Sequence, residues 1–135
     1  MMATNFDAVK AHYAASDRRD MAGMMAPVTA QTRWTEMAGF PYAGTYVGPE
    51  AIIAGVFARI GADGDGFSFT LERLLDAGHE VVGIGHYNGT CKATGKSMTA
   101  RVVHVWSMED GKVLAFEQFA DTARVAEAMS KGGNA

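Results

Sequence analysis

The clearest candidate for chemistry is a histidine inside an apolar strand. The strand that we predict at 99–108 alternates between two faces, and one face carries Val102, His104, Trp106 and Met108. A histidine among apolar side chains can donate, accept or transfer a proton near neutral pH. It can equally be a buried histidine whose hydrogen bonds a neighbouring strand satisfies. The residues alone leave both alternatives open.

A second group of polar side chains lies near the end of the last predicted strand, 113–120. Phe116 and Gln118 share a face there, and we expect both to face a pocket beside Trp106. Gln118 cannot exchange a proton at neutral pH. Asp121 follows, and its carboxyl group is a candidate acid. Asp121 is also typical of a helix N-cap, because it directly precedes Thr122, where we expect a terminal helix to begin.

These side chains are positioned by helices in the first half of the chain and strands in the second. Thr4 to Asp7 resembles a capping box that opens the first helix. Pro49 is typical of a helix start, and Asp110-Gly111 of a hairpin turn. We predict helices at 4–16, 21–25, 49–60 and 122–129, and strands at 32–36, 67–75, 81–91, 99–108 and 113–120. Residues 38–48 are predicted to be a loop, and 131–135 a frayed tail after a single domain at 1–130.

This order favours an α+β fold with a strongly curved antiparallel sheet. Glycines interrupt the strand at 81–91, and the alternation slips at Arg73-Leu74-Leu75, which indicates a β-bulge. A curved sheet that N-terminal helices close forms a cone-like α+β roll with an internal pocket. Such a pocket is a natural site for a small ligand.

The composition of the chain argues against several classes of binding partner. The chain has 135 residues, a net charge of −3 and no basic block, so we expect no nucleic acid partner. No apolar run is long enough to span a bilayer, and the single cysteine, Cys91, is typical of a reducing compartment. We therefore expect a cytoplasmic protein with no membrane partner. Histidine and cysteine never occur at zinc-ligand spacing, and we expect neither a metal nor a cofactor.

Several segments together resemble a known family. They are Val9-Lys10-Ala11-His12-Tyr13-Ala14-Ala15, Tyr46-Val47-Gly48-Pro49-Glu50-Ala51-Ile52, His86-Tyr87-Asn88-Gly89, Arg101-Val102-Val103-His104-Val105-Trp106, and the stretch from Asp110 to Thr122. The chain resembles the nuclear transport factor 2-like superfamily, and within it the SnoaL-like polyketide cyclases and relatives of ketosteroid isomerase. The resemblance implies a cystatin-like α+β roll that takes a small, apolar carbonyl compound.

The resemblance also implies roles for individual residues. Tyr13 matches the tyrosine that donates a hydrogen bond to the substrate oxygen, and Glu36 matches the base beside the carbonyl group. His104 stands where an isomerase carries its oxyanion-stabilising acid. Gln118 stands where cyclase-like relatives carry an acidic residue, which counts against a transferred acid mechanism. Tyr13 can instead be core, and Glu36 a solvated residue at a strand end.

The remaining expectations concern the pocket wall and the outer sheet face. Trp34 and Phe57 are expected in an aromatic wall, and His86 is a further candidate for substrate binding whose face is undecided. Arg101 has the opposite parity to His104, so we expect it on the outer face, which is the predicted homodimer interface. Three functions stay open: a cofactor-free isomerase, cyclase or hydratase; a non-catalytic binder of lipophilic molecules; and a dimerisation module with a vestigial pocket.

Overall fold

Thr4 caps the first helix as the sequence predicts. In the computed structural model, which describes residues 4–131, the Thr4 hydroxyl accepts a hydrogen bond from the Asp7 backbone N–H at 3.0 Å. Helix α1 (Asn5–Asp17) buries Val9, His12, Tyr13 and Ala15. Helix α2 (Met21–Met25) follows after a short turn. Of the predicted frayed tail, residues 132–135 lie outside the described residues.

Six strands form one curved sheet. They are β1 (Val28–Glu36), β2 (Gly44–Val47), β3 (Gly64–Asp76), β4 (Glu80–Cys91), β5 (Ser97–Glu109) and β6 (Lys112–Ala120), in the order β2-β1-β6-β5-β4-β3. The sheet is antiparallel as predicted, except that β1 and β6 pair in parallel. That pairing joins strands from opposite ends of the chain, so no hairpin in the sequence indicates it. The predicted α+β roll is confirmed.

One strand was missed. Residues 44–47, which we predicted as loop, form β2 and pair antiparallel with β1. Gly44, at the start of β2, has a φ of 140°, a conformation that glycine adopts readily. The glycine-rich and aromatic composition of this segment therefore marks a short edge strand rather than an irregular loop.

The third predicted helix is one continuous helical segment with a π-helical centre. It consists of α3 (Pro49–Ile52), the π-helical η1 (Ile53–Phe57) and α4 (Ala58–Asp63). Gly55 lies in η1 where an added Cβ would stand 2.1 Å from a ring carbon of Tyr46, so the helix and β2 pack closely. The π-helical turn carries Val56 and Phe57, and π-turns recur at functional sites.

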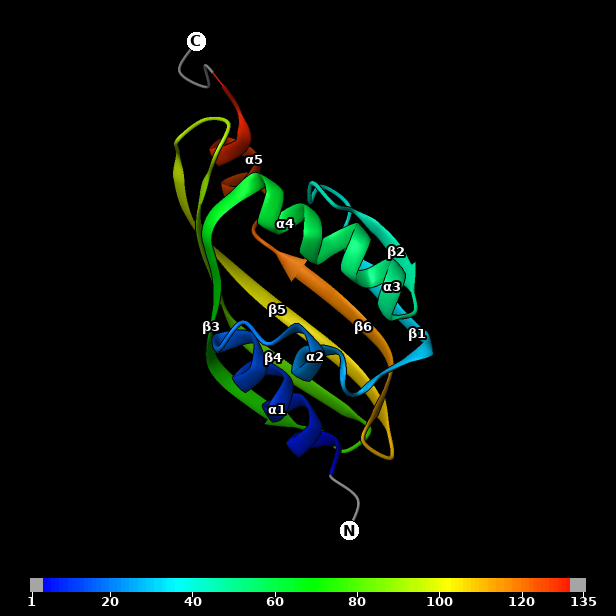
Figure 1. The fold of residues 1–135 in the computed structure, drawn as a ribbon. Coiled ribbons are helices and arrows are strands. Elements are labelled where there is room, and N and C mark those ends of the chain that lie inside the picture. Colours follow the sequence, from blue (N-terminus) through cyan, green and yellow to red (C-terminus); the bar gives the residue numbers. More distant parts are fainter. Residues whose placement is uncertain (1–3, 132–135) are drawn as a thin grey trace.

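The helices lie on one face of the sheet (Figure 1). Helix α1 lies over β3, β4 and β5 with α2 packed beside it, whereas α3 lies against β1 and β2, and α4 contacts β3. The register of β3 against β4 shifts between Leu71 and Arg73, which confirms the predicted bulge. The terminal helix α5 (Thr122–Met129) packs against β5 and β4. The concave side of the curved sheet thus encloses the core.

The outer face of the sheet carries a band of apolar side chains. Val82, Ile84, Val103 and Val105 lie next to one another by register, and Phe119 beside them is exposed. Arg101 lies on this face as predicted and pairs with Glu72 at 2.6 Å. The homodimer through this face stays a prediction. Within residues 4–131, no helix is long and apolar enough to cross a membrane.

Candidate functional site

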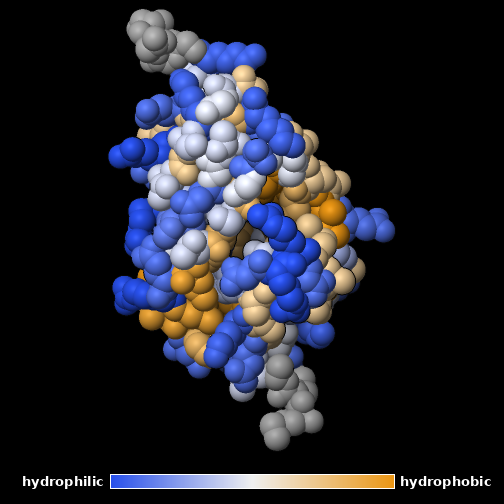
Figure 2. All heavy atoms as spheres, turned by 60° about the vertical axis from the view of Figure 1, so that its left-hand side comes forward, coloured by the Kyte–Doolittle hydropathy of each residue, from blue (hydrophilic) through white to orange (hydrophobic). Residues whose placement is uncertain are grey.

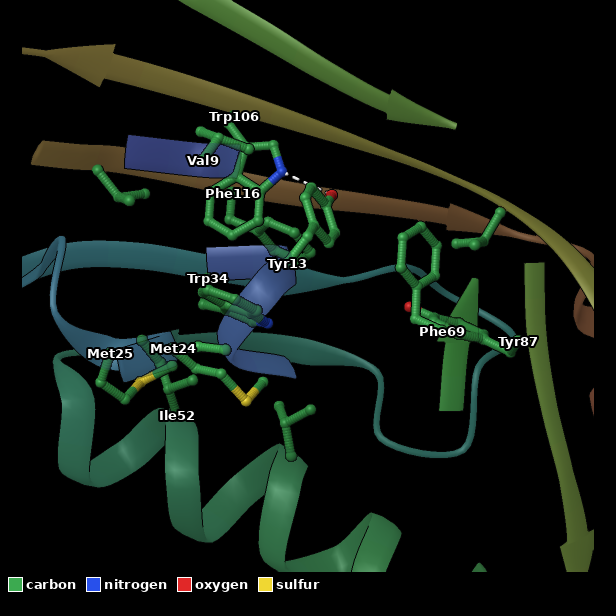
Figure 3. Close-up of a cluster of buried hydrophobic side chains, with 14 of the residues drawn as sticks. Val9, Tyr13, Met24, Met25, Trp34, Ile52, Phe69, Tyr87, Trp106 and Phe116 are labelled. Atoms are coloured by element: carbon green, nitrogen blue, oxygen red, sulfur yellow. Dashed lines mark hydrogen bonds between the residues drawn. The ribbon is translucent and has the colours of Figure 1, made fainter. Parts of the chain in front are cut away.

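Tyr13 projects from α1 toward the concave face of the sheet. Trp106 on β5 donates a hydrogen bond from Nε1 to the Tyr13 hydroxyl at 2.9 Å (Figure 3). The phenol ring lies between Trp106 and the pair formed by Phe69 and Tyr87. On β4, a Cβ added at Gly83 would stand 2.4 Å from the Tyr13 hydroxyl oxygen. The glycine therefore makes room for the hydroxyl group of Tyr13.

His104 joins two tyrosines. Its Nδ1 lies 2.7 Å from the Tyr13 hydroxyl, and its Nε2 lies 2.8 Å from the Tyr87 hydroxyl. Burial lowers the pKa of His104 from 6.5 to about 3, so the imidazole is neutral at physiological pH. A neutral imidazole carries one N–H and one acceptor nitrogen. The predicted parity of β5 is confirmed, since His104 and Trp106 are both buried on the inner face.

The cluster of Tyr13, Tyr87 and His104 carries one more donor hydrogen than its internal hydrogen bonds use. The two bonds to His104 require two hydrogens, while Tyr13, Tyr87 and His104 supply three. Each tyrosine oxygen already accepts one fixed N–H, from Trp106 and from Gln118 respectively. In either tautomer of His104, one tyrosine therefore keeps a hydroxyl hydrogen that no described bond uses. That hydrogen is available to an acceptor atom of a ligand.

Glu36 is buried rather than solvated. The exposed fraction of the residue is 3%, and its carboxyl oxygens accept hydrogen bonds of 3.0 Å from Trp34 Nε1 and from Gln118 Nε2. Burial raises the pKa of Glu36 from 4.5 to about 7, and the hydrogen bond from Trp34 opposes part of this rise. A carboxylate with this pKa can take up and release a proton near neutral pH.

Gln118 and Trp106 lie behind the groups that line the cavity. Gln118 donates to the Tyr87 hydroxyl and to Glu36, and its Oε1 is buried with no hydrogen-bond partner among the described residues. We predicted both residues to contact substrate directly. The structure instead gives them a positioning role: Trp106 holds Tyr13, and Gln118 holds Tyr87 and Glu36.

His12 comes from the same helix as Tyr13 and lines the same cavity. Its Nδ1 lies 2.9 Å from the carbonyl oxygen of Met24, and its ring packs edge-on against Trp106 at 4.6 Å between centroids. Burial lowers the pKa of His12 from 6.5 to about 4, so this imidazole is also neutral. The carbonyl acceptor fixes the proton on Nδ1.

The groups around the cavity enclose a small space. Water molecules can occupy about 50 Å³ of it, which is room for a few water molecules. Trp34 stacks on Phe116 at 3.8 Å between ring centroids, and Phe57 meets Trp34 edge-on, so the predicted aromatic wall is present. The lining residues are His12, Tyr13, Ser16, Met24, Trp34, Glu36, Val56, Phe57, Ile60, Phe67, Phe69, Tyr87, His104 and Phe116.

A larger cleft opens outside this cavity. It holds about 480 Å³ between the end of α1, helix α4 and the start of β3. Figure 2, in which the β3 side comes forward, shows the surface hollowed between hydrophilic side chains. The Arg19 guanidinium group donates to the carbonyl oxygen of Phe67 at 3.4 Å across this opening. The cleft adjoins the cavity, because six residues line both spaces: Ser16, Met24, Phe57, Ile60, Phe67 and Phe69.

Another cavity, of about 50 Å³, lies under α5. It is lined mainly by apolar side chains and contains none of the hydrogen-bonded cluster around His104. We therefore assign the candidate site to the cavity around Tyr13, Glu36 and His104. Within residues 4–131, no group of three or more His, Cys, Asp or Glu side chains is arranged to hold a metal ion.

Two predicted site residues lie elsewhere. His86 is on the outer face, where its Nδ1 lies 2.7 Å from a carboxyl oxygen of Glu72, so its prediction as a substrate-binding residue is wrong. The cause is strand parity: Tyr87, its neighbour, is the residue that faces inward. Asp121 is exposed, and its side chain accepts a hydrogen bond from the Arg124 backbone N–H at 3.3 Å. Of its two alternative roles, the structure supports the helix cap.

Two functional residues were missed, although the sequence contained a signal for each. Tyr87 follows Gly83 and Gly85 at alternate positions of β4, and strict alternation predicts an inward side chain for it. His12 lies three residues after Val9 on α1, a spacing that places both on one helix face. A concave sheet contacts a broad stripe of the helix, so adjacent residues both face the cavity.

Comparison with known proteins confirms the family. Residues 9–116 match the family described as the SnoaL-like domain, and the chain belongs to this family. An NTF2-like protein from Burkholderia thailandensis E264 is 52% identical with a TM-score of 0.94, over 96% of this chain and 99% of that one. TerC, co-crystallised with polyporic acid, is 26% identical with a TM-score of 0.82, over 93% and 97% of the two chains.

A curated relative is similar over a shorter segment. Patulin synthesis protein F from Aspergillus clavatus is 30% identical over 96 residues, which are 66% of this chain and 46% of that protein. The match therefore spans about half the length of that relative.

Proposed function

We propose that this protein binds a small carbonyl compound in the cavity and catalyses cofactor-free proton transfer at the carbon next to the carbonyl group. Glu36 removes the proton from that carbon. The electron pair of the C–H bond forms the carbon–carbon double bond of an enolate. The π pair of the carbonyl group moves to the oxygen, where a tyrosine hydroxyl stabilises the negative charge. Return of the proton from Glu36 to the same or another carbon completes an exchange or an isomerisation.

One observation carries this proposal: a buried carboxyl group with a pKa of about 7 lines the same cavity as a tyrosine cluster with an unused hydroxyl hydrogen. The carboxylate supplies a base that titrates near neutral pH. The hydroxyl group supplies the donor that an enolate oxygen needs. The low pKa of His104 keeps the imidazole neutral, so the cluster donates hydrogen bonds without carrying a positive charge.

The relatives agree with this class of ligand at a coarse level. TerC was co-crystallised with polyporic acid, and Patulin synthesis protein F is named for the synthesis of patulin. Both names point toward small oxygenated molecules. They support the class of ligand that we propose here, and the reaction is inferred from the cavity.

The experiment is hydrogen exchange at carbon. The protein is incubated in D₂O with butanone, cyclohexanone and hydroxyacetone, and deuterium uptake next to the carbonyl group is followed by NMR. We expect catalysed exchange by the native chain and a loss of about 100-fold or more in Glu36→Gln, since general-base catalysis contributes about 10²–10⁴-fold. Tyr13→Phe with Tyr87→Phe removes the hydroxyl donors. Glu72→Gln, on the outer face, is the matched control and should exchange at the native rate.

A different outcome would favour the second function. If the three ketones raise the melting temperature but exchange is no faster than in buffer, the protein is a binder of such molecules without chemistry. The aromatic wall around Trp34 and Phe116 suits that role as well. If the ketones neither bind nor exchange, the proposed function is wrong in both forms.

A further inference from the structure

The proposed reaction uses Glu36 and a tyrosine, and it leaves one buried basic group without a task. His12 is 5% exposed and lines the cavity. Its Nδ1 is engaged with the Met24 carbonyl oxygen at 2.9 Å, while its Nε2 makes no hydrogen bond to any residue in the range 4–131. Among the described residues, the one fully buried side-chain nitrogen or oxygen without a partner is Gln118 Oε1, so Nε2 of His12 is instead open to the cavity, where a bound molecule can reach it.

The chemistry of that nitrogen is fixed by its surroundings. Because a carbonyl oxygen only accepts, Nδ1 must carry the proton, and Nε2 is left with a lone pair. The neighbours are aromatic: Trp106, Trp34 and Tyr13 all pack against the ring within 6.2 Å between centroids. None of these contacts supplies a hydrogen bond to Nε2, so the lone pair is available to a molecule in the cavity.

We propose that His12 Nε2 accepts a hydrogen bond from a hydroxyl group of the ligand, so that the cavity selects hydroxy-carbonyl compounds over carbonyl compounds that lack the hydroxyl. This inference rests on the proposed function, which assigns the carbonyl oxygen to the tyrosine donor. The carbonyl oxygen of the ligand then accepts a hydrogen bond from the tyrosine, while its hydroxyl group donates one to His12 Nε2. A methyl group in place of the hydroxyl would cover the Nε2 lone pair without bonding to it, which costs affinity.

The first test needs no ligand. In ¹⁵N NMR spectra of the whole chain near neutral pH, His12 should show a protonated Nδ1 and an unprotonated Nε2. His104, with both nitrogens engaged by tyrosines, serves as the internal comparison. A proton on His12 Nε2 would overturn the inference, because a nitrogen that carries hydrogen cannot accept.

The second test compares two probes of nearly equal size, hydroxyacetone and butanone, which differ by a hydroxyl group in place of a methyl group. We expect hydroxyacetone to bind the native chain about tenfold more tightly, the factor that one hydrogen bond gives. Its binding should also shift the Nε2 resonance of His12. In His12→Asn, an amide can keep the bond to the Met24 carbonyl oxygen but has no atom at the Nε2 position. This variant should bind both probes equally.

The outcomes separate the two proposals. If the native chain binds both ketones with equal affinity, or if His12→Asn keeps the preference, the role of His12 is refuted while the proposed function stands. If neither ketone binds and no exchange occurs, the proposed function fails and the inference fails with it. Circular dichroism of His12→Asn checks its fold, and the native-chain measurements decide the question even where that variant is unfolded.

Discussion

Replacing Glu36 with glutamine should change how stability depends on pH. The pKa of Glu36 is about 7 in the folded chain against 4.5 in the unfolded one, so between these values the folded state binds the extra proton. Stability therefore falls as pH rises through this window, by about 3 kcal/mol at about 1.36 kcal/mol per pKa unit. Glu36→Gln removes this loss, because its side chain has no proton to release.

The assay is urea unfolding of both chains between about pH 4.5 and about pH 8. His12 and His104 have lowered pKa values, so their contribution is present above the unfolded value of 6.5 and is lost as pH falls toward about 4 and about 3. That contribution is common to both chains and cancels in the difference. The variant should gain about 3 kcal/mol relative to the native chain from low to high pH. A constant difference across the range would refute the burial-raised pKa.

Three further changes test the packing around the site. Gly83→Ala places a methyl group 2.4 Å from the Tyr13 hydroxyl oxygen, so we expect urea unfolding to show a loss of stability of about 1–3 kcal/mol. NMR should show that catalysed exchange is lost as well, and unchanged exchange would contradict the geometry. In Gly55→Ala the added methyl group would stand 2.1 Å from the Tyr46 ring, so the free energy of unfolding should fall by a similar amount while the pKa of Glu36 stays unchanged. Unaltered stability would show that the backbone of η1 shifts to make room. Asp121→Ala should cost about 0.5–2 kcal/mol with normal exchange, and lost exchange would restore a catalytic role.

Much of the fold could be predicted because its signals are local. Strand alternation placed His104 and Trp106 on the inner face and Arg101 on the outer face, and the structure agrees. The slip near Arg73 located the bulge in β3. Each of these features depends on residues close together in the chain, so periodicity alone contains the information.

The site itself depends on contacts between distant segments. Glu36 at the end of β1 is buried because β1 lies beside β6, which brings Gln118 to it across 82 positions of sequence. Nothing near Glu36 in the chain indicates that pairing. His12 was missed for a related reason: a helix next to a flat sheet buries a narrow stripe, whereas this curved sheet also covers the neighbouring position.

Gln118 explains why an amide can stand where an acid was expected. With Glu36 ionised, the Gln118 NH₂ group donates to both the carboxylate and the Tyr87 hydroxyl, and one tyrosine hydrogen stays free. In this arrangement the amide donates both of its hydrogens, while its buried Oε1 has no partner among the described residues. An ionised acid at this position could only accept hydrogen bonds and would repel the Glu36 carboxylate, so the amide suits a site in which Glu36 acts as the base.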